Sequence, residues 1–407
     1  MEWNVRLRIL LIDPVASTPD LTARALLTSK VPTLGADPAA VRRVNLVELG
    51  GSLAGLGHPT TVVLGDLYLG GQTWTLSEGL KVVPARTSLR VPFHPGLFPF
   101  TPFLEADARL ADSDVIQTGE FHQPSTFFAC RFGRERGIPV VVWQETFAPM
   151  RFPGSLYQLL FEMTVGEAVA TIPDRYVPRT TKARDYLRAL DIADDRVSGW
   201  IPTGIDTDAF SPGPSPFSPS DFGWREGCQI LLIAGRLHRA KGVDLALMAV
   251  KRALRRNPEV RLIVAGSGPE QVALRRLSVD LGVTDAVRMI GQRPRQDLIG
   301  LYNLADLVLC TSRMDLLPFT LIEAGACGRP CVATDVGAVR DIVTDGQTGR
   351  VVREPWPEAF VAALLSLLRD AETRARFGTE ARRRALAHFS LDRVAKGLLE
   401  VYRGVSQ

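Results

Sequence analysis

The chain alternates short apolar segments with longer segments whose apolar residues recur at helical spacing. In the second half the apolar segments are QILLIAG, VRLIVAG, AVRMIG, DLVLCTS, PCVAT and GRVV, and most are followed by a predicted helix. Parallel strands covered on both faces read as continuous apolar runs, and a crossover helix links each strand to the next. The pattern therefore predicts an α/β fold with parallel, doubly wound sheets.

The first half shows the same alternation less regularly. Its predicted strands are LRILLID, TTVVLG, LKVVP, DVIQT, IPVVVW, AVATIP and VSGWIP. A long helix is predicted over residues 38–56, with Val41, Val44, Val47 and Leu49 on its inner face. Residues 92–106, PFHPGLFPFTPFLEA, contain too many prolines for a helix or a central strand and are predicted to be an aromatic loop.

A chain of 407 residues is long for a single hydrophobic core, so two domains are expected. The segment SPGPSPFSPSDFG, residues 211–223, has the composition of a linker and places the hinge near residue 215. We predict domains over 1–215 and 226–388, followed by an amphipathic helix in 389–407. Ligands of such sheets bind where the strands end, so the expected site is a cleft between the domains.

Composition narrows the class of protein. Apolar residues make up 46% and charged residues 23%, and the net charge is +4 with both signs interspersed, as expected for a globular enzyme rather than a nucleic-acid-binding or disordered protein. The basic runs KRALRR and ARRR are interpreted as solvated helix faces, with anionic lipid headgroups or an acidic acceptor as the alternative.

The cysteines and the apolar segments bear on the compartment. Five cysteines without a CxxC pair predict neither a disulfide framework nor a zinc site, and favour a reducing cytoplasm. The beginning MEWNVRLRILLID is interpreted as a first strand rather than a signal peptide. No segment approaches the roughly 20 apolar residues of a membrane span, so any contact with the inner membrane is expected to be peripheral.

Two cations follow the strand QILLIAG, which ends at Gly235. Arg236 and Lys241 are five residues apart, just before a predicted helix. The planar guanidinium and the compact ammonium suit a diphosphate, although incidental charges on a solvated turn are the alternative.

Two acids flank a predicted helix start after DLVLCTS. Asp315 precedes Leu316, Leu317, Pro318 and Phe319, and Glu323 follows within an apolar run. Proline is favourable in a first helical turn, and the exposed N–H groups there attract anions. Carboxylates at these two positions can bind sugar hydroxyls. As alternatives, Asp315 is a simple helix cap and Glu323 a surface acid.

Glycines mark two further strand ends. LIVAGSGPE places Gly266 and Gly268 after one strand, and MIGQRP places Gly291 and Gln292 after the next. Glycine there permits close approach of the backbone to a base or ribose, but many ordinary turns share this pattern.

Taken in order, these motifs resemble a known family. GRLHRAKGVD, LIVAGSGPE, IGQ, LYNLADLVLCTS and DLLPFTLIEAGACGRPCVATDVGAVRDIVTDGQTGRVV resemble the C-terminal domain of family 4 glycosyltransferases, and IPTGIDTDAF resembles the crossover that leads into it. The resemblance is dense over residues 186–352 and mostly topological before them. It implies the GT-B fold, in which two Rossmann-like domains face a central cleft, the first on the acceptor side and the second binding a nucleotide sugar, with the last helix packing back on the first domain.

The resemblance also implies roles for individual residues. Arg236 and Lys241 match the pair that binds the donor diphosphate, Glu323 the acid that holds the ribose, and Asp315 the acid that contacts the transferred sugar. The backbone of residues 316–319 would meet sugar and phosphate, and Gly291 and Gln292 would lie near the base. Family members retain anomeric configuration and mostly need no metal or cofactor; the donor would be a UDP-, GDP- or ADP-linked hexose, and the acceptor a hydroxyl group, soluble or lipid-linked.

The sequence departs from the family in three places. The leading acid is Asp315 rather than glutamate. The stretch of residues 13–38 lacks the Gly-Gly turn of many relatives. Family histidines near the sugar are matched by Gln117 and by Gln144 with Glu145, of which Glu145 is the candidate for contact with sugar or acceptor; His122 lies close by, as an active-site group or a loop residue.

Other functions stay open at this point. A metal role for Asp206-Thr207-Asp208 is disfavoured, because it falls in the crossover. A sugar-nucleotide epimerase, an inverting transferase or a non-catalytic partner subunit would share the fold. A glycan, a glycolipid or a small metabolite could be the acceptor, and the aromatic loop either meets an apolar acceptor or membrane, or packs on the N-terminal core. Oligomeric state is not encoded in any recognisable pattern.

Overall fold

The computed structural model describes residues 6–12, 38–65, 69, 71–86, 110, 112–149, 154–353 and 357–406. The chain forms two compact units. Unit 1 contains Met1–Gly204 and Leu391–Gln407, and unit 2 contains Ile205–Ser390. Residues 13–37 and the aromatic loop of residues 92–106 lie outside the described residues, so the predictions made for them are not addressed below.

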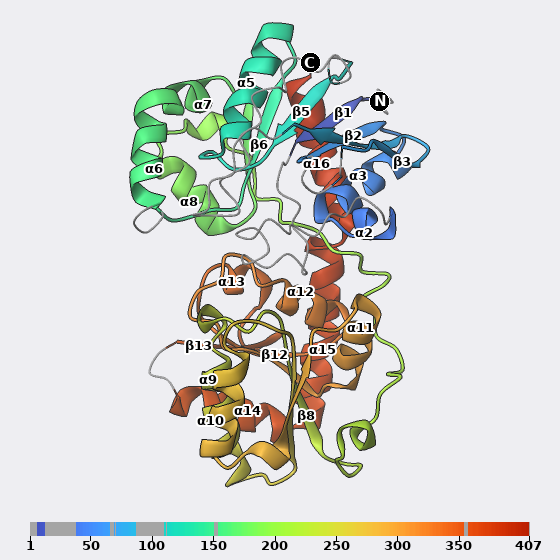
Figure 1. The fold of residues 1–407 in the computed structure, drawn as a ribbon, viewed down its shortest axis with the longest axis vertical. Helices are drawn as coiled ribbons and strands as arrows, with labels where there is room; N and C mark the ends of the chain where they lie inside the picture. Colours follow the sequence, from blue (N-terminus) through green and yellow to red (C-terminus); the bar gives the residue numbers. More distant parts are fainter. Residues whose placement is uncertain are drawn as a thin grey trace. The chain divides into compact units, whose positions relative to one another are not determined.

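Unit 1 is built on a seven-stranded sheet in the order β3-β4-β2-β1-β5-β6-β7 (Figure 1). All neighbours are parallel except β3 and β4, which are antiparallel at one edge. The strands are β1 (Ile9–Ile12), β2 (Thr60–Gly65), β3 (Trp74–Ser77), β4 (Leu80–Ala85), β5 (Val115–Thr118), β6 (Val140–Gln144) and β7 (Arg175–Pro178). The edge strand β3 was not predicted.

The central strand β1 shows why its sequence is continuously apolar. Ile9 and Leu11 point into a core shared with α3 and α16, whereas Leu10 and Ile12 point into a core on the opposite face shared with α5. Successive side chains alternate between faces, so a strand covered on both sides needs apolar residues at every position.

The helices of unit 1 correct two predictions. They are α2 (Pro38–Arg42), α3 (Asn45–Gly55), α5 (Pro124–Arg136), α6 (Gly154–Phe161), the π-helix η3 (Glu162–Gly166), α7 (Glu167–Thr171), α8 (Thr181–Ala189), the short 3₁₀ turn η4 (Asp194–Arg196) and α16 (Leu391–Val405). The predicted long helix breaks at Val44, which has an extended conformation, although its predicted inner residues are buried. The segment AVATIP was predicted as a strand but lies in α7 and the turn after it.

The predicted strand VSGWIP is also wrong. Only Val197 forms a bridge, with Tyr176 of β7, although the N–H groups of Ser198 and Ile201 also donate to carbonyls of that strand. The seventh strand is instead RYVP, residues 175–178. Short apolar segments are equally compatible with a buried helix and a strand, which is why periodicity did not separate them.

Unit 2 has a six-stranded parallel sheet in the order β10-β9-β8-β11-β12-β13, as predicted from its alternating pattern. The strands are β8 (Gln229–Ala234), β9 (Val260–Ala265), β10 (Val287–Gly291), β11 (Leu307–Cys310), β12 (Cys331–Thr334) and β13 (Gly349–Val352). The helices are η5 (Pro219–Phe222), η6 (Arg239–Lys241), α9 (Val243–Leu254), α10 (Gln271–Asp280), η7 (Thr284–Ala286), α11 (Arg295–Leu304), α12 (Phe319–Ala326), α13 (Val339–Ile342), α14 (Glu358–Arg369) and α15 (Ala371–His388).

The proline-rich segment packs on unit 2, so the division falls at Gly204 rather than near residue 215. The Asn303 side chain donates to the carbonyl of Ser211 and accepts from the N–H of Gly213. Arg382 donates to the carbonyls of Thr207, Phe210 and Ala326. Proline and serine therefore mark here an ordered strap over the unit, not a flexible linker.

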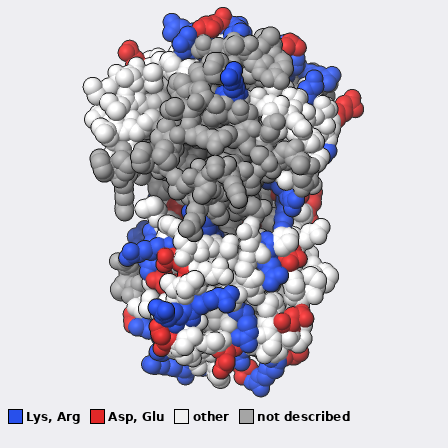
Figure 2. Space-filling model, viewed as in Figure 1, with Lys and Arg blue, Asp and Glu red and all other residues white. Residues whose placement is uncertain are grey.

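The surface and the cysteines agree with the composition. Lysine and arginine side chains are interspersed with aspartate and glutamate on the described surface that Figure 2 shows. All five cysteines are buried and free. Across the described ranges, no helix is both long and apolar enough to cross a membrane.

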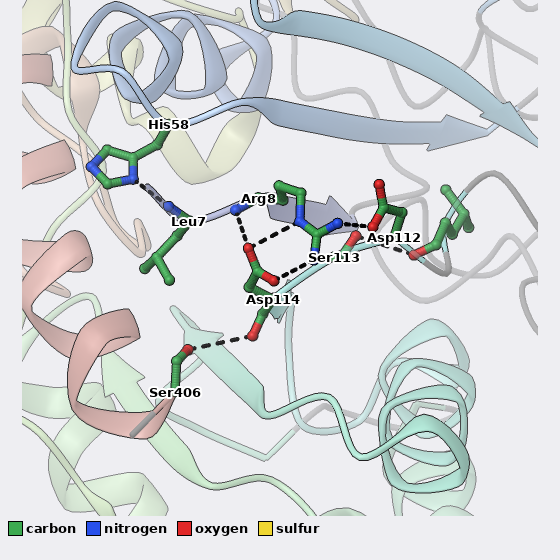
Figure 3. Close-up of polar contacts among 8 residues, drawn as sticks. Leu7, Arg8, His58, Asp112, Ser113, Asp114 and Ser406 are labelled. Atoms are coloured by element: carbon green, nitrogen blue, oxygen red, sulfur yellow. Dashed lines mark hydrogen bonds and ion pairs between the residues drawn. The ribbon is translucent and has the colours of Figure 1, made fainter. Parts of the chain in front are cut away.

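The last helix, α16, completes the interior of unit 1, where it lies beside α3 (Figure 1). Its Val394, Leu398 and Tyr402 are buried in the same core as β1. After the end of α16, Ser406 Oγ donates to the carbonyl of Asp114 at 3.4 Å (Figure 3). Asp114 is itself bound to Arg8, the residue before β1, with Nη2 of Arg8 2.6 Å from Oδ1 of Asp114.

Candidate functional site

Two loops of unit 2 leave the sheet from neighbouring strands and are bound to each other. The loop after β8 contains residues 235–242, and the loop after β11 contains residues 311–318. The backbone N–H of Arg313 donates to the carbonyl of Ala240 at 2.7 Å. The Arg313 guanidinium forms two 2.7 Å hydrogen bonds with the carboxylate of Asp244 at the start of α9. The loops form one rigid platform.

Two predicted site residues meet on this platform. Lys241 Nζ lies 2.5 Å from Oδ2 of Asp315, and Ser312 Oγ donates to the same oxygen at 3.3 Å. The side chain of Asp315 is 11% exposed and that of Lys241 is 39% exposed, so the ammonium keeps an accessible side. The pair depends on Gly242, whose φ is +63° and whose added Cβ would lie 2.0 Å from the carbonyl oxygen of Thr311.

Arg236, the other predicted cation, occupies the same loop and is half-buried. Its guanidinium makes no hydrogen bond or ion pair with any residue in the described ranges. A half-buried guanidinium that shares a loop with Lys241, and that pairs with no acid in the described ranges, is a ready partner for an anionic ligand.

The second predicted acid, Glu323, is held from a neighbouring helix. It lies about one turn inside α12, and its Oε2 accepts the hydroxyl hydrogen of Tyr302 at 2.7 Å. Burial raises the pKa of the Tyr302 hydroxyl well above its ordinary value, and the charge of Glu323 raises it further, so Tyr302 stays a donor. Tyr302 was missed from the sequence, where it looks like one more core residue of an amphipathic helix.

The start of α12 differs slightly from the prediction. The helix begins at Phe319, and Pro318 occupies the preceding N-cap position rather than the first turn. Leu317 and Pro318 are buried, whereas Leu316 is 38% exposed and its carbonyl accepts from the N–H of Ala338.

The glycines after β8 and β9 approach protein backbone. A Cβ on Gly266 would lie 1.8 Å from the carbonyl oxygen of Gly235, and one on Gly268 would lie 2.3 Å from that of Leu237. These glycines let the strand-exit loops stack on one another. Gly291, with φ +75°, has nothing within 4 Å of such a Cβ, and Gln292 beside it is exposed.

In unit 1 the two predicted glutamines are internal. Gln117 is 2% exposed and accepts the hydroxyl hydrogen of Tyr402. Gln144 is fully buried and accepts from the N–H of Phe121 at 2.8 Å. Glu145 is the accessible member of the predicted set: its Oε2 lies 2.8 Å from Nη1 of Arg179, and its side chain is 21% exposed.

His122 is buried and paired with an acid. Its Nε2 lies 2.8 Å from Oε1 of Glu162, the first residue of the π-helix η3. Burial lowers the pKa of His122, although Glu162 acts in the opposite direction. Single π-helical turns inside α-helices are frequent at functional sites.

The sequence Asp206-Thr207-Asp208 serves a turn. Oδ1 of Asp206 accepts from the N–H groups of Asp208 and Ala209, at 3.1 and 3.0 Å. Nowhere in the described ranges do three or more His, Cys, Asp or Glu residues gather as metal ligands would.

Known proteins resemble this chain in sequence and in fold. The family model "Glycosyl transferases group 1" matches residues 215–384. A D-inositol 3-phosphate glycosyltransferase of Frankia alni is 31% identical over 92% of this chain and 97% of its own length. HepE of Anabaena, solved with UDP and also with UDP-glucose, superimposes with a TM-score of 0.72 in the UDP complex, at 17% identity over 98% of this chain and 100% of its own.

A second solved structure agrees with the first. Sucrose-phosphate synthase of Thermosynechococcus elongatus gives a TM-score of 0.70 at 18% identity, over 98% of this chain and 99% of its own. Two parallel-sheet units with this topology define the GT-B class of glycosyltransferase. The chain belongs to the group 1 glycosyltransferases, and the resemblance noted in the sequence is confirmed.

Proposed function

We propose that the protein transfers a hexosyl group from a nucleotide-diphosphate sugar to a hydroxyl acceptor, with retention of anomeric configuration. One observation carries the donor half of the proposal: the Lys241–Asp315 pair, 2.5 Å apart, lies in the same two loops as Arg236, a cation that pairs with no acid among the described residues. Two cations and a carboxylate at adjoining strand ends suit a ligand that carries both phosphates and hydroxyls.

Each predicted residue receives a role in this proposal. Arg236 and Lys241 bind the diphosphate and stabilise the charge that develops on it as the sugar leaves. Asp315 accepts hydrogen bonds from the transferred sugar, while Lys241, which is paired with Asp315, also donates to the phosphates. Glu323, oriented by Tyr302, binds the two ribose hydroxyls.

The backbone completes the donor site in this proposal. The N–H groups at the start of α12, around residues 316–319, bind phosphate and sugar, since a helix N-terminus attracts anions. Gly291 and Gln292 lie at the end of β10 and border the base. The stacked glycines Gly235, Gly266 and Gly268 keep the loops close enough for backbone groups to reach the nucleotide.

Retention is proposed to follow same-face substitution, in which a phosphate oxygen of the donor removes the proton of the acceptor hydroxyl. The bond from the anomeric carbon to the phosphate oxygen breaks as the bond to the acceptor oxygen forms. The protein contributes fixed charge around the leaving diphosphate, which is the most effective place for it.

The relatives supply the first substrates to test. HepE binds UDP-glucose, and the Frankia relative is named for D-inositol 3-phosphate as acceptor. We propose a UDP-sugar as the first donor to test, with GDP- and ADP-sugars as alternatives, and a polyhydroxylated acceptor. A cytoplasmic role in glycan, glycolipid or envelope polysaccharide synthesis, with peripheral membrane contact for a lipid-linked acceptor, extends the same proposal.

The test combines binding, turnover and stereochemistry. UDP-, GDP- and ADP-glucose are compared by thermal shift, because a ligand that binds only the folded state raises the melting temperature. Lys241→Ala and Glu323→Ala are expected to lower sugar transfer and donor hydrolysis at least about tenfold, the effect of one lost charge-assisted contact. Arg256→Ala removes an exposed cation elsewhere in unit 2 and serves as the matched control.

The proposal fails if both variants turn over donor as Arg256→Ala does. The anomeric configuration of the product, read from its proton coupling constants, decides between retention and inversion. Isomerisation of the donor without transfer would identify an epimerase instead.

A further inference from the structure

Three neighbouring strands of unit 1 deliver charged residues to one edge of the sheet. Glu120 follows β5 after one glycine, Glu145 directly follows β6, and Arg179 directly follows β7. β6 lies between the other two in the sheet order. Because all three strands are parallel, their carboxyl ends meet, which is where ligands of open α/β sheets bind.

Glu120 spans two of these loops. Its Oε1 accepts the N–H of Glu145 and its Oε2 accepts the N–H of Thr146, each at 2.9 Å. Its own carbonyl accepts the hydroxyl hydrogen of Thr126 at 2.8 Å. One carboxylate thus fixes two consecutive amides, and with them the direction in which the Glu145 side chain leaves the backbone.

The pair of Glu145 and Arg179 is fixed from the other side by an aromatic ring. Cζ of Arg179 lies 4.1 Å from the ring centroid of Trp143, and the indole N–H of Trp143 donates to the carbonyl of Ile201 at 2.8 Å. A guanidinium stacked on an indole loses most of its freedom to turn. The backbone of Arg179 is also held in place, because its N–H donates to the carbonyl of Gln144 at 2.7 Å.

Both members of the pair keep unused hydrogen-bonding capacity. Among the described residues, Oε1 of Glu145 and Nη2 of Arg179 take part in no hydrogen bond, whereas the unpartnered Nε of Arg179 is buried. The side chains are 15% and 21% exposed, so the pair is neither sealed in the core nor freely solvated. A donor and an acceptor held side by side match hydroxyl groups, each of which can both accept and donate.

The charges also indicate the kind of group that fits. Glu145 and Arg179 neutralise each other, and Glu120 adds a further acid behind them. Burial raises the pKa of Glu120, Arg179 lowers it and Glu145 raises it again. Neutral hydroxyl groups would meet both an acceptor and a donor here, whereas an anionic group would face the carboxylate of Glu145.

We propose that Glu120 is a positioning residue, which holds Glu145 and Arg179 as a subsite for the uncharged hydroxyl groups of a polyol or sugar acceptor. This inference rests on the proposed function and deepens its acceptor half. A phosphate on the acceptor, if there is one, binds outside this subsite.

The chain supplies a matched control at the opposite end of the same strand. Oδ2 of Asp174 accepts the N–H of Val140, the first residue of β6, at 2.8 Å. Glu120→Gln and Asp174→Asn each replace a carboxylate that accepts backbone N–H hydrogen bonds at one end of β6. Only Glu120 lies at the carboxyl end of the strand. In Glu120→Gln the amide keeps one acceptor oxygen, so one of the two backbone N–H groups loses its partner.

The experiment measures steady-state kinetics of the full chain with UDP-glucose as donor and with myo-inositol and D-inositol 3-phosphate as acceptors. For Glu120→Gln and Glu145→Gln we expect the KM of both acceptors to rise about tenfold, as for loss of one hydrogen bond to a charged group, while the KM of the donor stays within about twofold. Asp174→Asn should change neither KM. Hydrolysis of UDP-glucose in the absence of acceptor should be alike in Asp174→Asn and in the unsubstituted chain.

Three results would overturn the proposal: equal acceptor KM values in Glu120→Gln and Asp174→Asn, parallel changes in donor and acceptor KM, or failure of the unsubstituted chain to bind or glycosylate either polyol. These results leave the donor half of the proposed function standing, because it is tested separately by the thermal shift with UDP-glucose and by the Lys241→Ala and Glu323→Ala variants of unit 2. If UDP-glucose neither raised the melting temperature of the unsubstituted chain nor was hydrolysed by it, the proposed function would be contradicted instead.

Discussion

Tyr302 donates its hydroxyl hydrogen to Oε2 of Glu323 over 2.7 Å, from the fully buried interior of α11. The Tyr302→Phe substitution removes only this donor. We expect the KM of UDP-glucose to rise about tenfold and the free energy of unfolding to fall by about 1–3 kcal/mol, since a charged acceptor loses its partner. Kinetics and urea titration measure both. Tyr402→Phe removes an equally buried hydroxyl from unit 1, and its donor KM should not change; equal donor KM values in the two variants would remove Tyr302 from the site.

Gly242 determines where Lys241 lies. Alanine there must adopt φ +63°, and its Cβ would meet the carbonyl oxygen of Thr311 at 2.0 Å, so the loop must move. We expect Gly242→Ala to lower donor hydrolysis at least about tenfold and to cost more than the 1–2 kcal/mol of a left-handed alanine alone. Gly282 has φ +66° and nothing within 4 Å, and Gly282→Ala therefore measures the backbone strain without the collision. Similar activity in the two variants would show that the position of the loop does not matter.

Arg313 holds the two donor loops together through Asp244. Burial acts to raise the pKa of Asp244, but the hydrogen bonds and charge of Arg313 outweigh it and keep that pKa below its ordinary value. A carboxyl group with a lowered pKa stabilises the fold above its unfolded pKa, and this contribution disappears as the pH falls through the folded value. Arg313→Ala should therefore lower the melting temperature clearly at pH 7 and progressively less below about pH 4. A constant difference at all pH values would mean that the ion pair contributes nothing.

The buried His122 should make the free energy of unfolding depend on pH in the acidic range. Burial lowers its pKa below 6.5, so the unfolded chain binds this proton more readily than the folded protein does. The free energy of unfolding then rises with pH up to about 6.5 and levels off above it. His122→Gln should reduce this slope, whereas His238→Gln, at an exposed position, should not. Melting temperatures between pH 5 and 8 provide the measurement, and an unchanged slope in His122→Gln would contradict the assignment.

Much of unit 2 could be predicted because its periodicity is strong. Every strand predicted for this unit is present in its sheet. In unit 1 the segment AVATIP was assigned to a strand, because a mostly apolar run of six residues has no distinguishing period. The edge strand β3 was missed since its burial alternates over only four residues.

The residues of the candidate site also fall into two groups, those marked by a local sequence pattern and those that are not. Lys241 and Asp315 were predicted from charged residues in the loops that follow apolar strands, and the structure pairs them. Tyr302, Glu120 and Arg179 were not singled out. Each acts on a residue far away in sequence, as Tyr302 does on Glu323, and no local pattern distinguishes a tyrosine that orients a carboxylate from one that fills a core.

The return of α16 to unit 1 affects the order in which the protein can be completed during synthesis. Unit 2 is made of one continuous stretch, Ile205–Ser390, whereas the core around β1 needs Val394, Leu398 and Tyr402 from the last turns of the chain. The ribosome therefore releases a finished second unit before the first can close. Until α16 packs in place, Gln117 lacks the hydroxyl of Tyr402, and the apolar residues of β1 and α3 that share its core remain uncovered.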